Sequence, residues 1–401
     1  MAQRNEIFAS NIATLQVIAN DNWQSPLPVV TLDGINGDET VNISFDELSH
    51  LNHRYSYIIN HCEADWSPSQ ELIESDYVDG FASGNVIDEY EQSINTNTQY
   101  THYKITLPND RCRPKMSGNY TVTVIDEDQD NKPILKACFM VTEQTMKSEM
   151  TQTSNTDIDI NKSHQQISMR LNFGSNRVSS PDTQIKTVVL QNGRWDNAIK
   201  DAAPQYVMTD GMAWSHNRKL IFPGGNEYRK FETLDPTHTT MGLERVGWDG
   251  NAYHAWIFTD EPRTNYLYDE DADGAFCVRN SDNVGNDTQS EYILTHFTLK
   301  TSRQLGEVYV NGSMTQDRLD KKFQMAWNEN DGLYEAVVPL KQGYYNYQYL
   351  TRNPDGSITL LPSEGNFYQT ENSYQLLVYF RGQGERTDRL VNYLNLSCRQ
   401  P

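Results

Sequence analysis

The sequence predicts an all-β protein of about three β-sandwich domains in a row. Short runs of β-branched and aromatic residues recur along the chain, turn signals separate them, and a helical period of ten or more residues is hard to find. Many short strands at this spacing are typical of sandwiches and barrels. The chain has 401 residues, which is too long for a single hydrophobic core, because single cores stop growing beyond roughly 250–300 residues.

The strand signals are clearest in four runs that lie far apart in the chain, at 120–125, 186–190, 255–258 and 376–380. Turn signals fall between such runs, at Asp33-Gly34, Asn36-Gly37, 117–119, Asn192-Gly193, Asn311-Gly312 and Asp355-Gly356. The best helical candidate, residues 46–51, is barely a turn or two long. These signals predict many strands and little helix.

Two polar stretches, 143–157 and 280–290, carry few apolar residues and predict domain boundaries. They divide the chain into an N-terminal sandwich (1–145), a middle sandwich (146–288) and a C-terminal domain (289–401). Each segment has the length of a sandwich domain, and no clean internal repeat relates them.

The composition is acidic, with 33 Lys and Arg against 54 Asp and Glu, a net charge of −21. This charge disfavours nucleic acid as a partner, because binding to nucleic acid depends on Lys and Arg side chains that neutralise phosphates. An anionic membrane surface is disfavoured on the same ground. No stretch approaches the ~20 apolar residues of a transmembrane segment, and the first residues lack the apolar run of a signal peptide.

The five cysteines are Cys62, Cys112, Cys138, Cys277 and Cys398. None forms a Cys-x-x-Cys pair, so zinc-ribbon and thioredoxin-like sites have no support. Three of them fall within residues 1–140, which leaves one local disulfide open.

Residues 61–66, His-Cys-Glu-Ala-Asp-Trp, gather nucleophile, base and acid side chains. A catalytic Cys–His pair must meet in space, whereas neighbours along a strand point to opposite faces. We therefore interpret the segment as the end of a strand with Trp66 as an anchor.

Two acidic runs raise the question of metal binding. Residues 269–274 read D-x-D-x-D-G like the start of a calcium loop, but the position of the required Glu holds Asn280 and no helix pattern flanks the run. Residues 126–131 read as a solvated hairpin tip. We predict no metal and no cofactor.

No Gly-rich phosphate loop, G-x-S-x-G or H-E-x-x-H motif occurs either, and the sequence predicts a protein that is not an enzyme.

The last segment combines a strand and turn at 307–312, a strand at 334–340 and an aromatic strand at 343–350. This order resembles the immunoglobulin-like modules that accompany glycan-active enzymes, whose exposed aromatics stack on sugars. Alternation places Tyr345, Tyr347 and Tyr349 on one face. Packing of this row in a core is the favoured reading, and sugar stacking is the alternative.

Six motifs between residues 43 and 120 occur in a specific order: 43–48, 55–69, 77–81, 93–103, 107–109 and 117–120. In this order they resemble the plug proteins of the Bacteroidota type IX secretion system. The resemblance extends more weakly through 343–349 and 381–389. Its marker residues are Phe45, Asp46, His61, Cys62, Asp65, Trp66, Asp79, Gly80, Ser117, Gly118, Asn119 and Tyr120.

The resemblance implies a periplasmic, outer-membrane-associated protein that binds the translocon barrel and seals its periplasmic opening. It implies a chain of immunoglobulin-like sandwiches, monomeric alone, with no catalytic residues. We expect the marker residues to determine the fold, and loop tips and exposed aromatics to contact the partner. The alternatives are a carbohydrate-binding or glycan-processing protein and a structural surface or adhesion protein.

Overall fold

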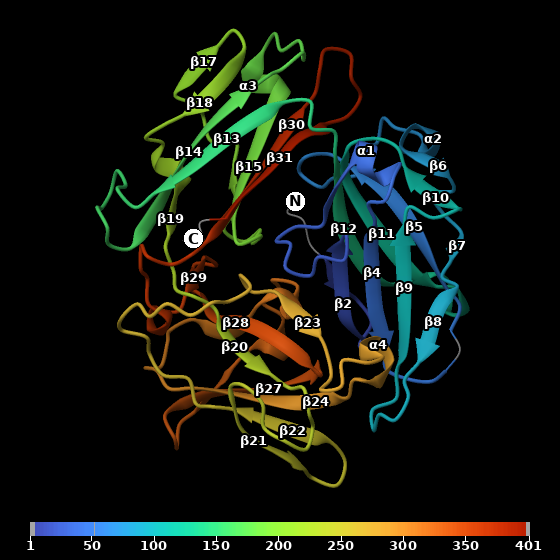
Figure 1. Cartoon of the computed structure of the whole chain (residues 1–401), viewed down its shortest axis with the longest axis vertical. Coiled ribbons are helices and arrows are strands. Elements are labelled where there is room, and N and C mark those ends of the chain that lie inside the picture. The colour runs from blue at the N-terminus through green and yellow to red at the C-terminus, as the bar shows by residue number, and fades with distance from the viewer. Residues whose placement is uncertain (1–4, 52, 398–401) are drawn as a thin grey trace.

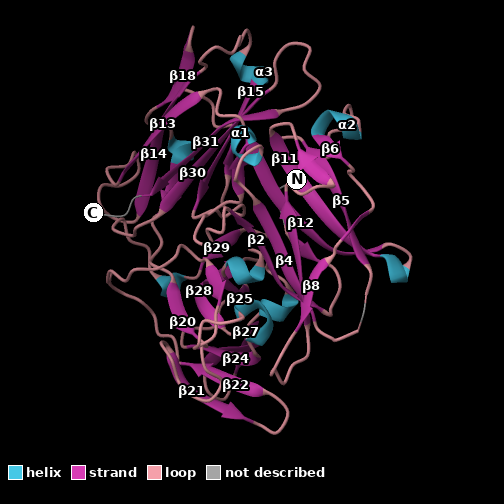
Figure 2. Cartoon of the chain, turned by 45° about the vertical axis from the view of Figure 1, so that its right-hand side comes forward, coloured by secondary structure: helices cyan, strands magenta, loops and turns pink. Residues whose placement is uncertain are grey.

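The computed structural model describes residues 5–51 and 53–397 and confirms the all-β prediction (Figures 1 and 2). Strands form almost all of the regular structure, and each helix is a single short turn. The α-helices are α1 (Leu32–Ile35), α2 (Glu74–Tyr77), α3 (Pro181–Gln184) and α4 (Asn286–Gln289). The 3₁₀ turns are η1 (Glu127–Gln129), η2 (Arg218–Leu220), η3 (Ser313–Thr315), η4 (Lys321–Phe323) and η5 (Pro362–Glu364).

The first unit, residues 5–143, is a sandwich whose two main sheets enclose one apolar core (Figure 1, right). One sheet has the order β1 (Glu6–Ile7), β12 (Lys132–Thr142), β11 (Gly118–Asp126), β5 (Tyr55–Cys62) and β7 (Asn85–Val86), with β3 (Val29–Thr31) parallel to β12. The other has the order β2 (Ile12–Ala19), β4 (Val41–Glu47), β9 (Thr101–Leu107) and β8 (Glu89–Gln92). A short ribbon pairs β10 (Cys112–Pro114) with β6 (Val78–Gly80).

The middle unit comprises residues 144–223 and 373–397 and also has two sheets over one core (Figure 1, upper left). The first sheet contains β13 (Lys147–Thr153), β14 (His164–Asn172), β18 (Gly211–Trp214), β17 (Tyr206–Met208) and, beside β14, β19 (Ile221–Pro223). The second has the order β16 (Ile199–Lys200), β15 (Ile185–Gln191), β30 (Ser373–Phe380) and β31 (Arg389–Ser397).

The third unit, residues 224–372, is the lower lobe of Figure 1. Around β28 (Gly343–Arg352) its inner sheet contains β20 (Arg229–Glu232), β23 (Phe276–Val278), β25 (Glu307–Asn311) and β29 (Ile358–Leu360). The outer sheet has the order β21 (Leu243–Trp248), β22 (Tyr253–Ile257), β24 (Tyr292–Leu299), β27 (Leu333–Lys341) and β26 (Ala326–Asn328).

The units do not follow one another along the chain as predicted. The first segment, 1–145, ends close to the end of β12 at Thr142, but the predicted limit at 288 falls inside the third unit. Strands β30 and β31, predicted to belong to 289–401, complete the middle unit, because β30 pairs with β15 along its length. The third unit is therefore an insertion in the middle unit.

Several local predictions also differ from the structure. The helical candidate 46–51 is the end of β4 followed by a bend, and Asp33-Gly34 lies in α1 rather than in a turn. The polar stretch 143–157 contains β13, a strand with its side chains largely exposed, so its polarity marks an accessible face rather than a linker.

No helix in the described part of the chain has the length and apolar character of a membrane span.

Candidate functional site: the joints between the units

An apolar cluster, separate from the cores of both units, joins the first unit to the middle unit. Trp66, at the end of the predicted anchor segment, lies in this cluster and packs edge-on against Trp195, with ring centroids 5.8 Å apart. Its backbone has a left-handed φ of 67°, in a turn in which the Trp66 N–H donates to the carbonyl of Glu63. The other buried members are Leu27, Ala64, Cys138, Met140, Val188, Leu190, Leu377, Tyr379 and Leu390.

His61 is a buried, fully hydrogen-bonded histidine in β5. Its Nε2 lies 3.1 Å from the carbonyl oxygen of Ser117 and its Nδ1 2.9 Å from the hydroxyl of Ser69. Burial lowers the pKa of His61, so the neutral imidazole donates from Nε2 and accepts at Nδ1. Gly118, at φ 142°, gives the ring room, because a Cβ there would lie 2.2 Å from Nε2.

Glu63 carries the polar half of the same joint. It pairs with Arg381 of the middle unit and accepts from the backbone N–H of Asp388 at 2.9 Å. Asp388 in turn accepts from the N–H of Ala64 at 3.0 Å and from Lys186 at 2.8 Å. Burial alone would raise the pKa of Asp388, but these donors outweigh it and lower the pKa.

Asn119 continues this contact from the first residues of β11. Its amide donates to the Glu63 carbonyl at 2.8 Å, and its Oδ1 accepts from the hydroxyl of Tyr379 at 2.9 Å. The anchor segment and the 381–389 segment, which the resemblance identified separately, thus meet at one joint.

The remaining marker residues lie within the first unit. Phe45 and Tyr120 are fully buried core rings, and Ser117 is buried beside His61. The exposed Asp65 accepts from the N–H and hydroxyl of Ser67 in the turn after β5. Asp79 and Gly80 belong to strand β6, in which Gly80 has a positive φ of 97°.

The first and third units are joined by a buried ion pair. The ammonium of Lys341 in β27 lies 2.7 Å from Oδ2 of Asp46 in β4, and both side chains are almost inaccessible to solvent. His102 contacts the other carboxylate oxygen at 2.7 Å, and the Tyr292 hydroxyl donates to Oδ2 at 2.7 Å. Burial alone would raise the pKa of Asp46, but Lys341 and His102 outweigh burial and lower it.

Backbone groups extend this second joint. The Tyr100 hydroxyl donates to the carbonyl of Ser290 at 2.8 Å, and Lys341 also donates to the carbonyl of Asp287. The N–H of Thr98 donates to the Glu291 carboxylate at 3.0 Å. Buried hydrogen bonds across a contact hold its two sides in one relative orientation, because moving them leaves polar groups unpaired.

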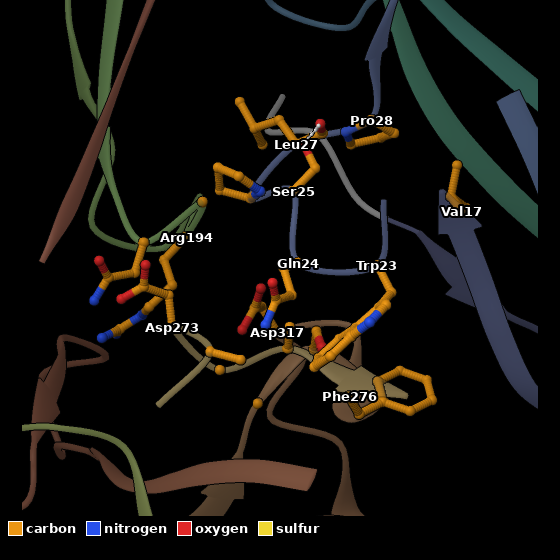
Figure 3. A pocket seen from close by; sticks show the side chains of 18 of the residues that line it. Val17, Trp23, Gln24, Ser25, Leu27, Pro28, Arg194, Asp273, Phe276 and Asp317 are labelled. Carbon is orange, nitrogen blue, oxygen red and sulfur yellow. Dashed lines mark hydrogen bonds between the residues drawn. The ribbon is translucent and has the colours of Figure 1, made fainter. Parts of the chain in front are cut away.

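All three units border a cavity of about 130 Å³ (Figure 3). Trp23 and Gln24 line it from the first unit, Arg194 from the middle unit, and Asp273 and Asp317 from the third. Two lining residues also join the first and third units directly, because the side-chain amide of Gln316 donates to the carbonyl of Leu15 at 2.6 Å.

Two carboxyl groups near this cavity bind protons unusually well. Burial and the neighbouring Asp273 raise the pKa of Asp271 to about 8, and burial and Asp196 raise the pKa of Asp317 to about 6. The aspartates of the 269–274 run do not form a metal-ligand group among the described residues: Asp269 pairs with Lys230, and Asp271 accepts from the N–H groups of Tyr228 and Asp273.

The cysteines of the described residues are free thiols, so the disulfide left open among the first three does not form. Burial raises the pKa of Cys62 to about 11 and that of Cys112 to about 12, which makes both unreactive. Cys398 lies outside the described residues.

Tyr345, Tyr347 and Tyr349 are buried in the core of the third unit, as the favoured reading of the alternation predicted. The hydroxyls of Tyr347 and Tyr349 donate to Asp260 at 2.8 and 2.6 Å. This row cannot stack on a sugar while the unit is folded.

Sequence reasoning identified the first-unit side of each joint and only part of the other side. Arg381 and Asp388 fall within the weakly resembling segment 381–389 but were not singled out in it, and Lys341 was missed because it is one charged residue in a strand with no motif around it. The one available signal was a lysine at the end of an alternating strand, Leu333–Lys341, where its side chain is buried.

The chain was compared with known families and proteins. The sequence model of the Type 9 secretion system plug protein 1st domain matches residues 12–143, which is the first unit. A crystal structure of a hypothetical protein from Parabacteroides merdae is similar at 39% identity and a TM-score of 0.94, over 99% of this chain and 100% of that one. No curated protein matches the chain.

Two bacterial surface proteins give far weaker similarities. They are a partial N-terminal region of an enterococcal surface protein (8% identity, 99% of this chain and 95% of that one, TM-score 0.20) and the collagen adhesin of S. aureus (8% identity, 97% and 92%, TM-score 0.12). Likenesses this low carry no argument. The match covers the first unit with the ordered motifs that it contains, so this unit belongs to the family of the type 9 secretion system plug protein 1st domain.

Proposed function

We propose that this protein is a non-enzymatic plug that binds the outer-membrane translocon barrel of the type IX system and seals its periplasmic opening. The match of the first unit to the plug protein family supports a role in this secretion system. A pore wide enough for folded cargo leaks unless something closes it. A stopper needs a defined shape and a large contact surface, and it needs no chemistry at its surface.

The observation that carries the proposal is the pair of buried joints. The Asp46–Lys341 ion pair and the Glu63–Asp388 contacts fasten the first unit to both other units. Buried ion pairs of this kind resist a change in the relative position of the units, because separating the two charges would leave each of them unpaired. Three sandwiches held in this way act as one rigid body, as a seal requires.

We propose that the contact surface includes an apolar edge of the first unit, formed by Leu48, Leu51, Tyr90 and Ile94. These side chains are between 36% and 66% exposed. The two segments that carry them are tied together, because His50 lies 2.9 Å from the Ser93 hydroxyl and its carbonyl accepts from Gln92. Exposed apolar groups that gather on one edge are typical of interaction surfaces.

Co-purification from native outer membranes tests the partner. We expect the protein to retain the translocon barrel, and Leu51→Asp or Ile94→Asp to weaken this retention. Leu305→Asp is the matched control, because Leu305 is 98% exposed on the third unit. If the protein does not retain the barrel, the proposed partner is wrong. If the wild type and the three variants retain it equally, the proposed contact edge is wrong.

Leakage tests the seal. Deleting the protein in a cell that has the secretion system should admit a small solute that the outer membrane normally excludes, and re-expression should restore exclusion. Unchanged leakage after deletion would overturn the sealing role even if the barrel co-purifies.

The alternative of glycan binding rested on the row of Tyr345 and Tyr347, which the third unit buries. No other observation favours it.

A further inference from the structure

Three metal-ligating side chains lie together where the loop before β5 meets the tip of the β11–β12 hairpin. They are His53, Asp126 at the end of β11, and Asp128 in η1. Their ligand atoms, one from each residue, all lie within 4.8 Å of one another. In the parts of the chain that the structure describes, this is the one group of at least three such side chains.

His53 holds its Nδ1 atom towards the carboxylates without a hydrogen bond. The atom is buried and has no partner within bonding geometry, and Oδ2 of Asp126 lies 3.4 Å away. Other histidine–aspartate pairs in this chain lie at hydrogen-bonding distance. These are His102–Asp46 and His164–Asp159 at 2.7 Å, and His216–Asp157 at 2.9 Å. A buried polar atom that lacks a partner calls for an explanation.

The separation of His53 and Asp126 fits two ligands of one metal ion. Zinc binds imidazole nitrogen and carboxylate oxygen at about 2.0–2.1 Å, and the edge of a tetrahedron with such bonds is about 3.3 Å. The 3.4 Å between Nδ1 and Oδ2 is close to this edge.

The surrounding contacts hold the carboxylates in place. Asp126 is buried and accepts from the N–H of Asp128 at 3.0 Å and from the Gln129 amide at 2.9 Å. The Asp128 carboxylate accepts from the N–H of Arg54 at 2.9 Å. Contacts of this kind orient metal ligands before the ion arrives. Asp128 is also exposed, which gives an ion a path from solvent.

We propose that His53, Asp126 and Asp128 bind one divalent transition-metal cation, of which Zn²⁺ fits best. One imidazole and two carboxylates supply three protein ligands, water can complete the coordination, and the two negative charges balance the dication. Calcium and magnesium prefer six or more oxygen ligands and are poorly served by a nitrogen donor. The ion would link the loop that contains Leu48 and Leu51 to the β11–β12 hairpin.

The test uses the full chain without a histidine tag, stripped with a chelator and titrated with ZnCl₂ in a calorimeter. We expect one ion per chain, and tetrahedral absorption bands when Co²⁺ replaces Zn²⁺. His53→Gln and Asp128→Asn should each weaken binding at least about tenfold, a loss that follows even from replacing residues that only hydrogen-bond to metal ligands. Because Asp128 is exposed, the Asp128→Asn variant should fold normally, and circular dichroism checks its folding.

His216→Gln is the matched control. His216 also pairs with an aspartate, Asp157, but within the residues that the structure describes the two do not belong to a group of three metal-ligating side chains. This variant should bind Zn²⁺ as the wild type does. The proposal is overturned if Zn²⁺ does not bind, if His53→Gln or Asp128→Asn binds as tightly as the wild type, or if CaCl₂ or MgCl₂ binds this site as tightly as ZnCl₂.

Discussion

The ammonium of Lys341 and the carboxylate of Asp46 meet at 2.7 Å although 295 residues separate them in the chain. One belongs to β27 of the third unit and the other to β4 of the first. Lys341 also lies 4.1 Å from the centre of the Tyr100 ring, so the charge is enclosed by the two units together. Moving the units apart would break the pair.

Replacing Lys341 tests how strongly this pair fastens the units. Lys341→Met leaves Asp46 buried without its main partner and should lower the free energy of unfolding by about 3–5 kcal/mol. Urea denaturation measures the loss. The double variant Asp46→Asn, Lys341→Met should recover much of it, because no unpaired charge remains.

Lys300→Met is the control for that experiment, because Lys300 pairs with Glu261 at the exposed surface. Its cost should stay below about 1 kcal/mol. Equal losses for Lys341→Met and Lys300→Met would show that the buried pair does not fasten the joint.

Gly118→Ala should destabilise the protein through His61. The added Cβ would lie 2.2 Å from Nε2 of the imidazole, so the ring must leave its bond to Ser117. We expect a loss of about 1–3 kcal/mol in the free energy of unfolding. Gly250→Ala also replaces a glycine with positive φ, 98°, but meets open space. If both variants cost the same, backbone strain rather than the histidine explains the effect.

Trp66→Ala should loosen the joint between the first and middle units. Removing a buried tryptophan costs about 3–5 kcal/mol. Limited proteolysis should cut faster at residues 143–146, where the chain passes between the two units. Trp248→Ala, at a ring that is 48% exposed, should leave the cleavage rate unchanged. Unaltered cleavage in Trp66→Ala would mean that the tryptophan serves the first unit alone.

Asp271 and Asp317 should make the protein less stable as the pH rises. Their folded pKa values, about 8 and about 6, lie above the ordinary value near 3.9, so the folded state holds more protons between these limits. Stability should therefore fall from about pH 4 to pH 8. Urea denaturation of Asp317→Asn across pH 4–6 should show a flatter slope than the wild type. An unchanged slope would contradict the assignment.

Asp46 acts in the opposite direction and in another range. Its pKa is lowered by Lys341 and His102, so its contribution is complete above the ordinary carboxyl pKa and is lost as the pH falls through the folded value. Acid unfolding of Asp46→Asn below pH 4 should accordingly be less steep than that of the wild type.

The fold class was predictable because it depends on local signals. Residues 120–125 and 376–380 read as strands from their side chains alone, and both lie in strands. The pairing of β30 with β15 was not predictable, because every residue of β30 is buried and its sequence carries no mark of its neighbour. Strand pairings between distant segments leave no local pattern.

The joints were half predictable for a similar reason. Asp46, His61 and Trp66 belong to ordered motifs and Arg381 lies in the weakly resembling segment 381–389, whereas Lys341 becomes recognisable only when the folded chain brings it opposite Asp46. Residues 126–131 form the tip of the β11–β12 hairpin and 128–131 are exposed, as predicted, but the burial of Asp126 beside His53 was not predicted. Asp126 is buried because its position at the end of β11 faces the loop that carries His53.

The insertion of the third unit sets an order of events in folding. Until residues 373–380 arrive, β15 has only the two-residue strand β16 along one edge and an open row of backbone donors and acceptors along the other. A chain that emerges from its N-terminus must therefore carry an unfinished middle sheet while it completes some 150 residues of another unit. During that interval the edge of β15 is the place where a chaperone, or a second copy of the chain, would find a strand to pair with.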